Sequence, residues 1–527
     1  MTTTPAHAIA TALASERVRY LFGMPGGGNN LDVIGACEAE GITFVLAHTE
    51  TGAAIMASAY AELTDTVGAC VVTRGPGAAS VVNGAAQAQQ DRQPLLVICD
   101  TVDQASSSRI AHQNIDQQAM FAPVTTWSGT VGATDPDNVM RTAIHAARTP
   151  PCGAVHLDVD PSHTGTQAAP AAPPGRQGSM DELAALLAGA GRPVIVVGLG
   201  ARSHGAAIRE LVAGTSIPVL MTYKAKGLVP DSGPNSAGAF TGSQTDGAVL
   251  EAADLIITLG LDSIELIPNP WTYSAAVLAL AETCDSYRYF EPDVAVVGPL
   301  AELIAMLPDL PDHWPTGFGA KHRLAIVRDL LDGPVRRPGI APWDVVRIAR
   351  ASAAGTSIAT VDAGAHMLVA MALWSTEGPG QVMISSGLAT MGYAVPAAVG
   401  AALARPDVRV YCFVGDGGLM MCLGELETIA RLGLSITIIV FNDRTLSLIK
   451  AKQRADGHGG LDAVQYTLTD FAVVAQGLGL PSATAFTDSE FASAVSADGP
   501  GPLLIDVRID AENYRHVIDV VRQRSAR

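Results

Sequence analysis

Two polar side chains follow two apolar runs in the last third of the chain. Asp416 stands in a Gly-Asp-Gly-Gly sequence at 415–418, directly after the run Arg409–Val414, and Asn442 follows the run Ile436–Phe441. A carboxylate and an amide carbonyl are oxygen ligands that Mg²⁺ accepts, while phosphate and water complete its shell. Glycines beside the carboxylate allow backbone N–H groups to approach a phosphate. The pattern predicts a site for a divalent cation and a diphosphate.

The elements around these residues form one strand–helix–strand unit. A helix over Leu419–Leu432 is expected between the two apolar runs, which have strand length. Connections of this kind join parallel neighbours, so Asp416 and Asn442 should lie together at the carboxyl ends of adjacent strands. The alternative is an ordinary strand–helix turn with an acidic cap.

The same alternation of short apolar runs and helical stretches recurs along the chain. Two stretches rich in Pro, Leu307–Pro342 and the linker-like Pro161–Ser179, separate three blocks, which are 1–162, 180–306 and 340–527. Continuous Val/Ile/Leu strands predict parallel sheets covered on both faces, hence three α/β domains with doubly wound, Rossmann-like sheets. The strands expected are 44–47, 69–73, 94–99, 154–159, 193–197, 218–222, 255–259, 276–280, 357–361, 381–385, 409–414 and 436–441.

The composition excludes several classes of protein. The net charge of −18 and the absence of a basic run argue against a nucleic-acid partner, and 48% hydrophobic residues argue against disorder. No apolar stretch is long enough to predict a membrane span. The seven scattered cysteines, none in a Cys-x-x-Cys pair, indicate free thiols in the reducing cytoplasm.

Further motifs stand in a characteristic order. They are Phe22–Gly28, His48–Ala53, Thr73–Gly77 and Ser386–Gly392, and 24 residues separate Gly417 from Asn442. With them the whole chain resembles the thiamine diphosphate enzymes of the acetolactate synthase, benzoylformate decarboxylase and pyruvate decarboxylase group. The resemblance implies a pyrimidine-binding domain, a middle domain and a diphosphate- and Mg²⁺-binding domain in the three blocks. It also implies a site shared between two subunits, in a homodimer at least and commonly a tetramer.

The resemblance assigns roles to individual residues. Glu50 becomes the catalytic carboxylate that activates the cofactor's pyrimidine ring, although its position alone favours a first-turn helix glutamate stabilised by the helix dipole. Asp416, Asn442 and the carbonyl of Arg444 become the metal ligands. The cofactor contacts implied are Pro25, Gly26, Glu50, Pro76, Gln113, His366, Gly387, Ala389, Met391, Asp416, Gly417, Gly418 and Asn442.

Departures from the family pattern bear on the substrate. Gly27 and Gly28 replace an acidic or serine residue of the decarboxylases, and Thr73 replaces a catalytic histidine of benzoylformate decarboxylase. A decarboxylase needs a proton donor for its intermediate, so these changes favour a carboligase. Arg74 is a candidate partner for a substrate carboxylate or else forms a salt bridge. Lys450 either faces an anionic substrate or lies on the solvated side of a helix at Leu446–Arg454.

The favoured function is therefore acetolactate synthase-like C–C bond formation from a 2-oxo acid. Non-oxidative 2-oxo acid decarboxylation and 2-hydroxyacyl-CoA lysis stay open, as does a catalytically inactive cofactor-binding paralogue. A NAD-dependent oxidoreductase would use the Rossmann-like Val196–Ala201 segment, which lacks a full Gly-x-Gly-x-x-Gly. The residues Gly260–Glu265 replace the run that contacts FAD in acetolactate synthases, which argues against FAD.

Overall fold

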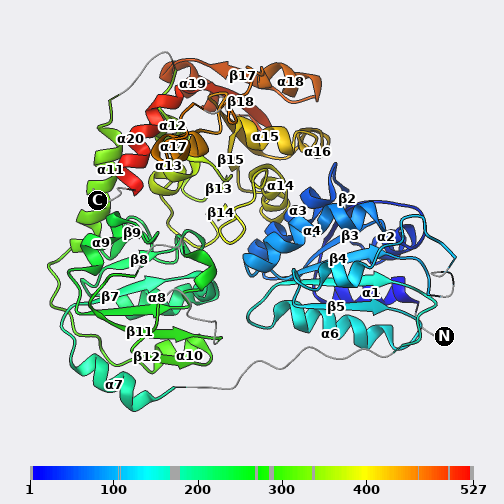
Figure 1. Cartoon of the computed structure of the whole chain (residues 1–527), viewed down its shortest axis with the longest axis horizontal. Helices are drawn as coiled ribbons and strands as arrows, with labels where there is room; N and C mark the ends of the chain where they lie inside the picture. Colours follow the sequence, from blue (N-terminus) through cyan, green and yellow to red (C-terminus); the bar gives the residue numbers. More distant parts are fainter. Residues whose placement is uncertain are drawn as a thin grey trace.

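Three parallel sheets of six strands each make up the computed structural model, and they form three lobes in Figure 1. The structure describes residues 4–104, 106, 109–165, 178–266, 271–283, 290–334, 339–460, 462–496 and 499–522. Most of the predicted linker at 161–179 and Cys284 lie outside these residues. Helices alternate with the strands throughout, which confirms the α/β class. Within the described residues, no helix is both long enough and apolar enough to cross a bilayer.

The first sheet, at the right of Figure 1, has the strand order β2-β1-β3-β4-β6-β5. After β1 the chain adds β2 on one side and β3 on the other, so a crevice opens at the carboxyl ends of β1 and β3. The elements are α1 (Pro5–Ser15), β1 (Tyr20–Met24), α2 (Asn29–Ala39), β2 (Thr43–Leu46), α3 (Glu50–Thr64), β3 (Gly68–Val72), α4 (Pro76–Gln90), β4 (Leu95–Asp100), α5 (Gln117–Phe121), β5 (Trp127–Val131), α6 (Pro136–Arg148) and β6 (Ala154–Val159).

The middle sheet has the order β12-β11-β10-β7-β8-β9, with its crevice between β7 and β10. The elements are α7 (Met180–Ala188), β7 (Pro193–Val197), η1 (Leu199–His204), α8 (Gly205–Val212), β8 (Val219–Met221), η2 (Tyr223–Ala225), β9 (Ser236–Ala239), α9 (Gln244–Leu250), β10 (Leu255–Leu259), η3 (Ser263–Glu265), β11 (Ala276–Ala281), β12 (Val294–Val297), α10 (Leu300–Ala305) and α11 (Phe318–Leu331).

The third sheet has the order β14-β13-β15-β16-β18-β17, with its crevice between β13 and β15. The elements are α12 (Pro342–Ser352), β13 (Ile358–Val361), α13 (Ala365–Leu373), β14 (Val382–Ile384), α14 (Ala394–Ala404), β15 (Val410–Gly415), α15 (Asp416–Met421), α16 (Glu425–Leu432), β16 (Ile436–Asn442), α17 (Ser447–Ala455), α18 (Phe471–Gly477), β17 (Ser482–Ala485), α19 (Asp488–Val495), β18 (Leu503–Arg508), η4 (Ala511–Asn513) and α20 (Tyr514–Arg522).

Helices α3 and α14 join the first and third lobes. Both are built almost wholly from small and apolar residues, and both contribute to one continuous buried core. A side chain at Gly400 would lie 2.3 Å from the Met56 carbonyl oxygen, so glycine is required for this approach. Part of the alanine and glycine content of the chain therefore serves close helix packing.

The strand–helix–strand unit at 409–442 is confirmed in one respect and corrected in another. β15 and β16 are parallel neighbours, with Gly415 opposite Phe441. The single helix predicted over 419–432 is instead two helices, α15 and α16. The break falls where Gly424 meets the first lobe, and a Cβ there would lie 2.7 Å from Cβ of His48.

Candidate active site

The crevice of the third sheet contains the Gly-Asp-Gly-Gly turn. Asp416 is the buried first residue of α15. Its Oδ1 accepts the Gly417 N–H at 2.7 Å, and its Oδ2 accepts the Arg444 N–H at 2.7 Å. Burial raises the pKa of Asp416 to about 6. Two backbone donors thus hold a carboxylate in place at the end of β15.

Asn442 ends the neighbouring strand β16 and leaves one polar atom unsatisfied. Its Nδ2 donates to the Thr469 carbonyl at 3.0 Å and to Asp506 Oδ1 at 2.9 Å, which fixes the amide. The buried Oδ1 has no hydrogen-bond partner. An unpaired buried acceptor destabilises a fold, and a bound ion commonly satisfies such an atom. Mg²⁺ prefers oxygen ligands, and three groups here can supply them: Asn442 Oδ1, the Asp416 carboxylate and the adjacent backbone carbonyl of Arg444.

A cavity of about 230 Å³ lies beside this turn. Its walls come from residues between 363 and 514, so no described residue of the first lobe lines it. It brings together six of the residues predicted to contact the cofactor. These are His366, Ala389, Met391, Asp416, Gly417 and Gly418.

His366 presents a polar atom in the wall of this cavity. Its ring stacks on Phe441 with centroids 5.3 Å apart, and its buried Nε2 has no hydrogen-bond partner. Burial lowers the pKa of His366 to about 4, so the imidazole is neutral at pH 7. Only one nitrogen of a neutral imidazole carries a hydrogen, so Nε2 can donate to a phosphate oxygen in the tautomer that has its hydrogen on Nε2.

Sequence reasoning missed two acidic residues here. Asp362 accepts the N–H groups of Gly392 at 3.0 Å and Tyr393 at 3.1 Å, and its Oδ2 lies 2.0 Å from where a Cβ on Gly418 would stand. Asp443 lines the cavity. Burial raises the pKa of both to about 7, and the charge of Asp416 adds to the effect at Asp443. Their places beside predicted site residues were the only signal in the sequence.

A second cluster occupies the crevice of the first sheet. Glu50 is the first residue of α3, whose N-cap hydroxyl on Thr49 accepts the Gly52 N–H at 3.0 Å. Glu50 Oε1 lies 3.4 Å from where a Cβ on Gly77 would stand, and a Cβ on Gly26 would lie 2.2 Å from Thr73 Oγ1. The predicted Pro25, Gly26, Glu50 and Pro76 therefore gather at the ends of β1 and β3.

Other predicted residues surround this second cluster. Gln113 has a left-handed backbone with φ of 56° and lies against Gly75. Arg74 Nη1 lies 3.9 Å from Asp100 Oδ2, so the guanidinium has a carboxylate partner within the chain. A Cβ on Gly28 would lie 3.3 Å from the same Asp100 Oδ2, whereas nothing lies within 4 Å of one on Gly27.

Two predicted residues lie outside both clusters. The Gly387 N–H donates to Asp91 Oδ1 at 2.8 Å, in the contact between the first and third lobes. Lys450, on α17, lines a neighbouring groove of about 710 Å³, and its Nζ lies 3.9 Å from Glu512 Oε1. This groove shares Ser447, Leu448 and Tyr514 with the cavity.

Known proteins resemble the chain along nearly its whole length. The chain is 29% identical to the acetolactate synthase isozyme 1 large subunit of Escherichia coli K12, over 97% of this chain and 94% of that protein. It is 30% identical to the catabolic acetolactate synthase of Raoultella terrigena, over 95% and 94%. The solved structure of a thiamine diphosphate-dependent 4-hydroxybenzoylformate decarboxylase from Rhodococcus jostii RHA1 has the same fold. Its TM-score is 0.81 at 20% identity, over 96% of this chain and 99% of that one.

Three family profiles cover most of the chain. The N-terminal thiamine pyrophosphate-binding domain matches residues 3–120, the central domain of these enzymes matches 180–307, and the C-terminal thiamine pyrophosphate-binding domain matches 362–507. The last of these matches contains the cavity residues from Ala363 to Ile449. The chain belongs to the thiamine pyrophosphate-dependent enzymes.

Proposed function

We propose that this enzyme uses Mg²⁺ with thiamine diphosphate and joins a fragment of a 2-oxo acid to an acceptor, as an acetolactate synthase-like carboligase. The observation that carries the proposal is the buried, unpaired Oδ1 of Asn442 beside Asp416 in the crevice of the third sheet. In this scheme residues 1–162 bind the pyrimidine, 340–527 bind the diphosphate and metal, and 180–306 form a middle domain.

Different residues of the third lobe bind the metal and the diphosphate of the cofactor. Asp416, Asn442 and the Arg444 carbonyl bind Mg²⁺, while His366 and the Gly417–Gly418 turn lie beside the diphosphate. Bound thiamine diphosphate supplies an electron sink for bond changes beside a carbonyl. Ala389 and Met391 form another part of the cavity wall. Within the part of the chain that the structure describes, these residues fit the group.

In this proposal Glu50 comes from a second copy of the chain, because the described residues that line the cavity all belong to the third lobe. Exposed apolar side chains lie next to both clusters: Met24, at 37% exposure, precedes Pro25, and Met420 and Met421, at 53% and 61%, follow the Gly-Asp-Gly-Gly turn. Such exposed apolar residues are typical of an interface. A two-fold dimer would cover them and bring Glu50 of one copy to the cavity of the other, where its carboxylate can hold a proton at the pyrimidine.

The surroundings of Thr73 favour the carboligase over the decarboxylase. A Cβ on Gly26 would lie 2.2 Å from Thr73 Oγ1, and one on Gly77 would lie 2.9 Å from its Cγ2, so both glycines pack directly on a hydroxyl side chain that is a poor proton donor compared with an imidazole. Nothing lies within 4 Å of a Cβ on Gly27, which leaves space beside it for an acceptor. Basic side chains outnumber the acidic Glu512 and Asp519 in the neighbouring groove, which suits an anionic substrate, and an acyl-CoA is the second candidate; the basic residues are Lys450, Lys452, Arg454, Arg515 and Arg522.

A substrate survey tests whether the enzyme is a carboligase, a decarboxylase or a lyase. Purified enzyme with thiamine diphosphate and Mg²⁺ is given a series of 2-oxo acids, each with and without an aldehyde or a second 2-oxo acid as acceptor. The proposal predicts CO₂ release that depends on the acceptor and yields a coupled product. Equal release without an acceptor, with an aldehyde as product, would identify a decarboxylase, and turnover of 2-hydroxyacyl-CoA alone would identify a lyase.

A further inference from the structure

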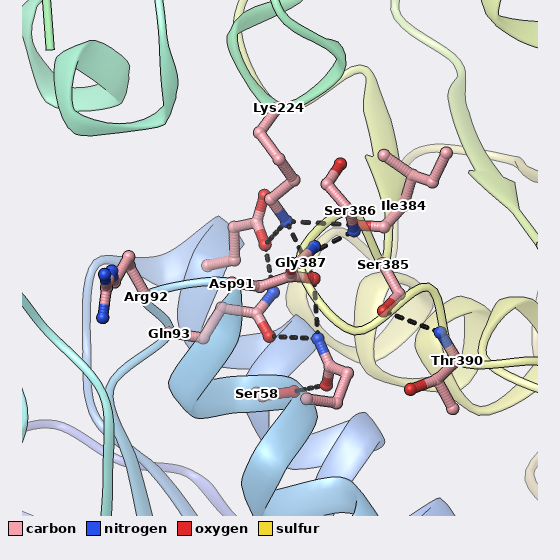
Figure 2. A network of polar contacts seen from close by, with 12 residues as sticks. Ser58, Asp91, Arg92, Gln93, Lys224, Ile384, Ser385, Ser386, Gly387 and Thr390 are labelled. Carbon is pink, nitrogen blue, oxygen red and sulfur yellow. Dashed lines mark hydrogen bonds and ion pairs between the residues drawn. The ribbon is translucent and has the colours of Figure 1, made fainter. Parts of the chain in front are cut away.

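A buried lysine of the middle lobe lies where all three lobes meet. Lys224, in η2, has a side chain that is only 1% exposed. Its Nζ donates to Glu62 Oε2 in the first lobe at 2.9 Å and to the Ile384 carbonyl in the third lobe at 3.3 Å. It also lies 3.8 Å from Asp91 Oδ2. Figure 2 shows Lys224 directed at the point where Asp91 faces the segment after Ile384.

Asp91, which lies beside Lys224, also binds the backbone of the third lobe. Its Oδ1 accepts the N–H groups of Ser386 at 3.1 Å and Gly387 at 2.8 Å, while Gln87 donates to Oδ2 at 2.8 Å (Figure 2). A Cβ on Gly387 would lie 2.8 Å from Cβ of Gln90, so the segment rests directly on the end of α4. A fully buried carboxylate with these partners costs much to displace.

The segment held in this way continues into the cavity. Ala389 and Met391 line the cavity, and Ala389 has a left-handed backbone with φ of 51°. A non-glycine residue adopts this conformation only where its surroundings hold it there. At the downstream end Asp362 accepts the N–H groups of Gly392 and Tyr393. The wall of the cavity is therefore a short strained span between two buried carboxylates, Asp362 in its own lobe and Asp91 in another.

We propose that Asp91 and Lys224 are positioning residues for the cofactor cavity: they clamp Ser386–Gly387 and thereby set where Ala389 and Met391 meet a bound thiamine diphosphate. The proposal rests on the proposed function, because that function places thiamine diphosphate in the cavity. Neither side chain lines the cavity itself. Their influence passes through the backbone of one segment.

Lys226 supplies a matched control. It belongs to the same turn after β8, and its Nζ forms a buried ion pair with Asp231 Oδ2 at 2.7 Å. Asp231 in turn accepts the N–H of Thr376 in the third lobe at 2.8 Å. Lys226 thus joins the middle lobe to the third through Asp231, but it does not touch the 385–391 segment or the first lobe's Asp91.

The test compares Asp91→Ala, Asp91→Asn, Lys224→Met and Lys226→Met in the full-length enzyme. The readouts are the melting temperature, the calorimetric affinity for thiamine diphosphate with Mg²⁺, and the rate at which the C2 proton of the bound cofactor exchanges with D₂O. Asp91→Ala should slow C2 exchange about tenfold to a hundredfold, since a small misplacement of a site has effects of this size. Asp91→Asn, which keeps an acceptor, should recover most of the rate. Lys226→Met should lower the melting temperature without slowing exchange.

Two results would overturn the clamp: a wild-type exchange rate in folded Asp91→Ala, or an equal slowing in Lys226→Met. If Asp91→Ala does not fold, amide hydrogen exchange in ligand-free Lys224→Met decides instead. Faster exchange of the 386–393 peptide supports the clamp, and unchanged exchange rejects it. Failure of the wild-type enzyme to bind thiamine diphosphate would reject the proposed function, and the ligand-free experiment would still decide the clamp.

Discussion

Two glycine-containing turns of this chain each lie beside the crevice of their own sheet but have different surroundings. Gly198–Ala201 follows β7 and Gly415–Gly418 follows β15, each at the crevice where the strand order reverses. In the middle sheet the chain fills its own crevice: the Leu199 N–H donates to Glu265 Oε2 at 2.6 Å, and the Gly200 N–H donates to the Gly260 carbonyl at 2.8 Å. In the third sheet, Asn442 Oδ1 and His366 Nε2 are left unpaired beside the turn, whereas in the middle crevice an unpaired atom is Oε1 of Glu265, the residue that occupies it.

The partners of the polar groups decide whether such a turn can bind a ligand. Glycines in both turns permit close approach, and in both they are packed on neighbouring atoms, since a Cβ on Gly198 would lie 2.4 Å from Cα of Leu261. Packing alone therefore does not distinguish the turns. The Glu265 carboxyl accepts the Leu199 N–H and thereby occupies the place where a nucleotide phosphate would bind in a Rossmann-like turn. We therefore expect the middle lobe to bind neither FAD nor NAD.

The largest expected effect is at Gly415–Gly418, which we call the open turn because polar atoms beside it are unpaired. Asp416→Ala removes the carboxylate ligand of the proposed metal site, so the Mg²⁺-dependent affinity for thiamine diphosphate should fall about a hundredfold or more. Isothermal titration calorimetry measures this. Asp254→Ala, an acidic residue of the middle lobe, should leave the affinity unchanged. Retained affinity in Asp416→Ala would remove the contrast between the turns.

Glu50 tests whether the first lobe completes the open site. Glu50→Gln should reduce turnover by about a hundredfold or more, because loss of a proton-transfer group has effects of this order. Its melting temperature and its affinity for thiamine diphosphate should stay close to wild type. An active Glu50→Gln enzyme would show that the open turn works without this carboxylate.

Substitutions at Gly198–Ala201, which we call the filled turn because Glu265 occupies its crevice, should change the stability of the fold and not cofactor binding. Glu265→Ala leaves the Leu199 N–H without its acceptor and should lower the free energy of unfolding by about 1–3 kcal/mol, with no change in thiamine diphosphate affinity. Denaturant unfolding and calorimetry measure the two quantities. A variant that instead gained flavin or NAD binding would show that Glu265 blocks a functional nucleotide site.

The same carboxyl predicts a pH dependence. Burial raises the pKa of Glu265 from 4.5 to about 8, so between these values the folded state keeps a proton that the unfolded state has released. Stability therefore falls as pH rises through this window, by up to about 1.4 kcal/mol per pH unit for one proton. Glu265→Gln should make the measured slope shallower. An unchanged slope would place the proton elsewhere.

The smallest effects should come from added methyl groups. A Cβ on Gly417 would meet the side chains of Leu446 and Tyr466 at 3.1 and 3.3 Å, so Gly417→Ala should fold but weaken thiamine diphosphate binding by about threefold to tenfold, the effect of roughly 1 kcal/mol. Gly200→Ala places its methyl 3.0 Å from the Gly260 carbonyl and should lower only the melting temperature. Equal effects of both variants on binding would mean that the turns do not differ.

The sequence predicts what depends on neighbours along the chain. The apolar runs and the helix between them are local, so the adjacency of β15 and β16 is correctly predicted. Contacts between residues that lie far apart in the sequence could not be predicted from local patterns. Glu265 reaches Leu199 across 66 positions, and Asp91 reaches Gly387 across 296. The break between α15 and α16 likewise lies against His48, in another lobe.

Binding of thiamine diphosphate through a divalent cation in the crevice of the third sheet can be measured in one experiment. It is a calorimetric titration of the wild-type enzyme with thiamine diphosphate, once with excess Mg²⁺ and once with a chelator, each repeated on Asn442→Ala. We predict one cofactor per chain with Mg²⁺, little binding with the chelator, and weakened binding in Asn442→Ala. Equally tight binding under all four conditions would contradict the proposed site.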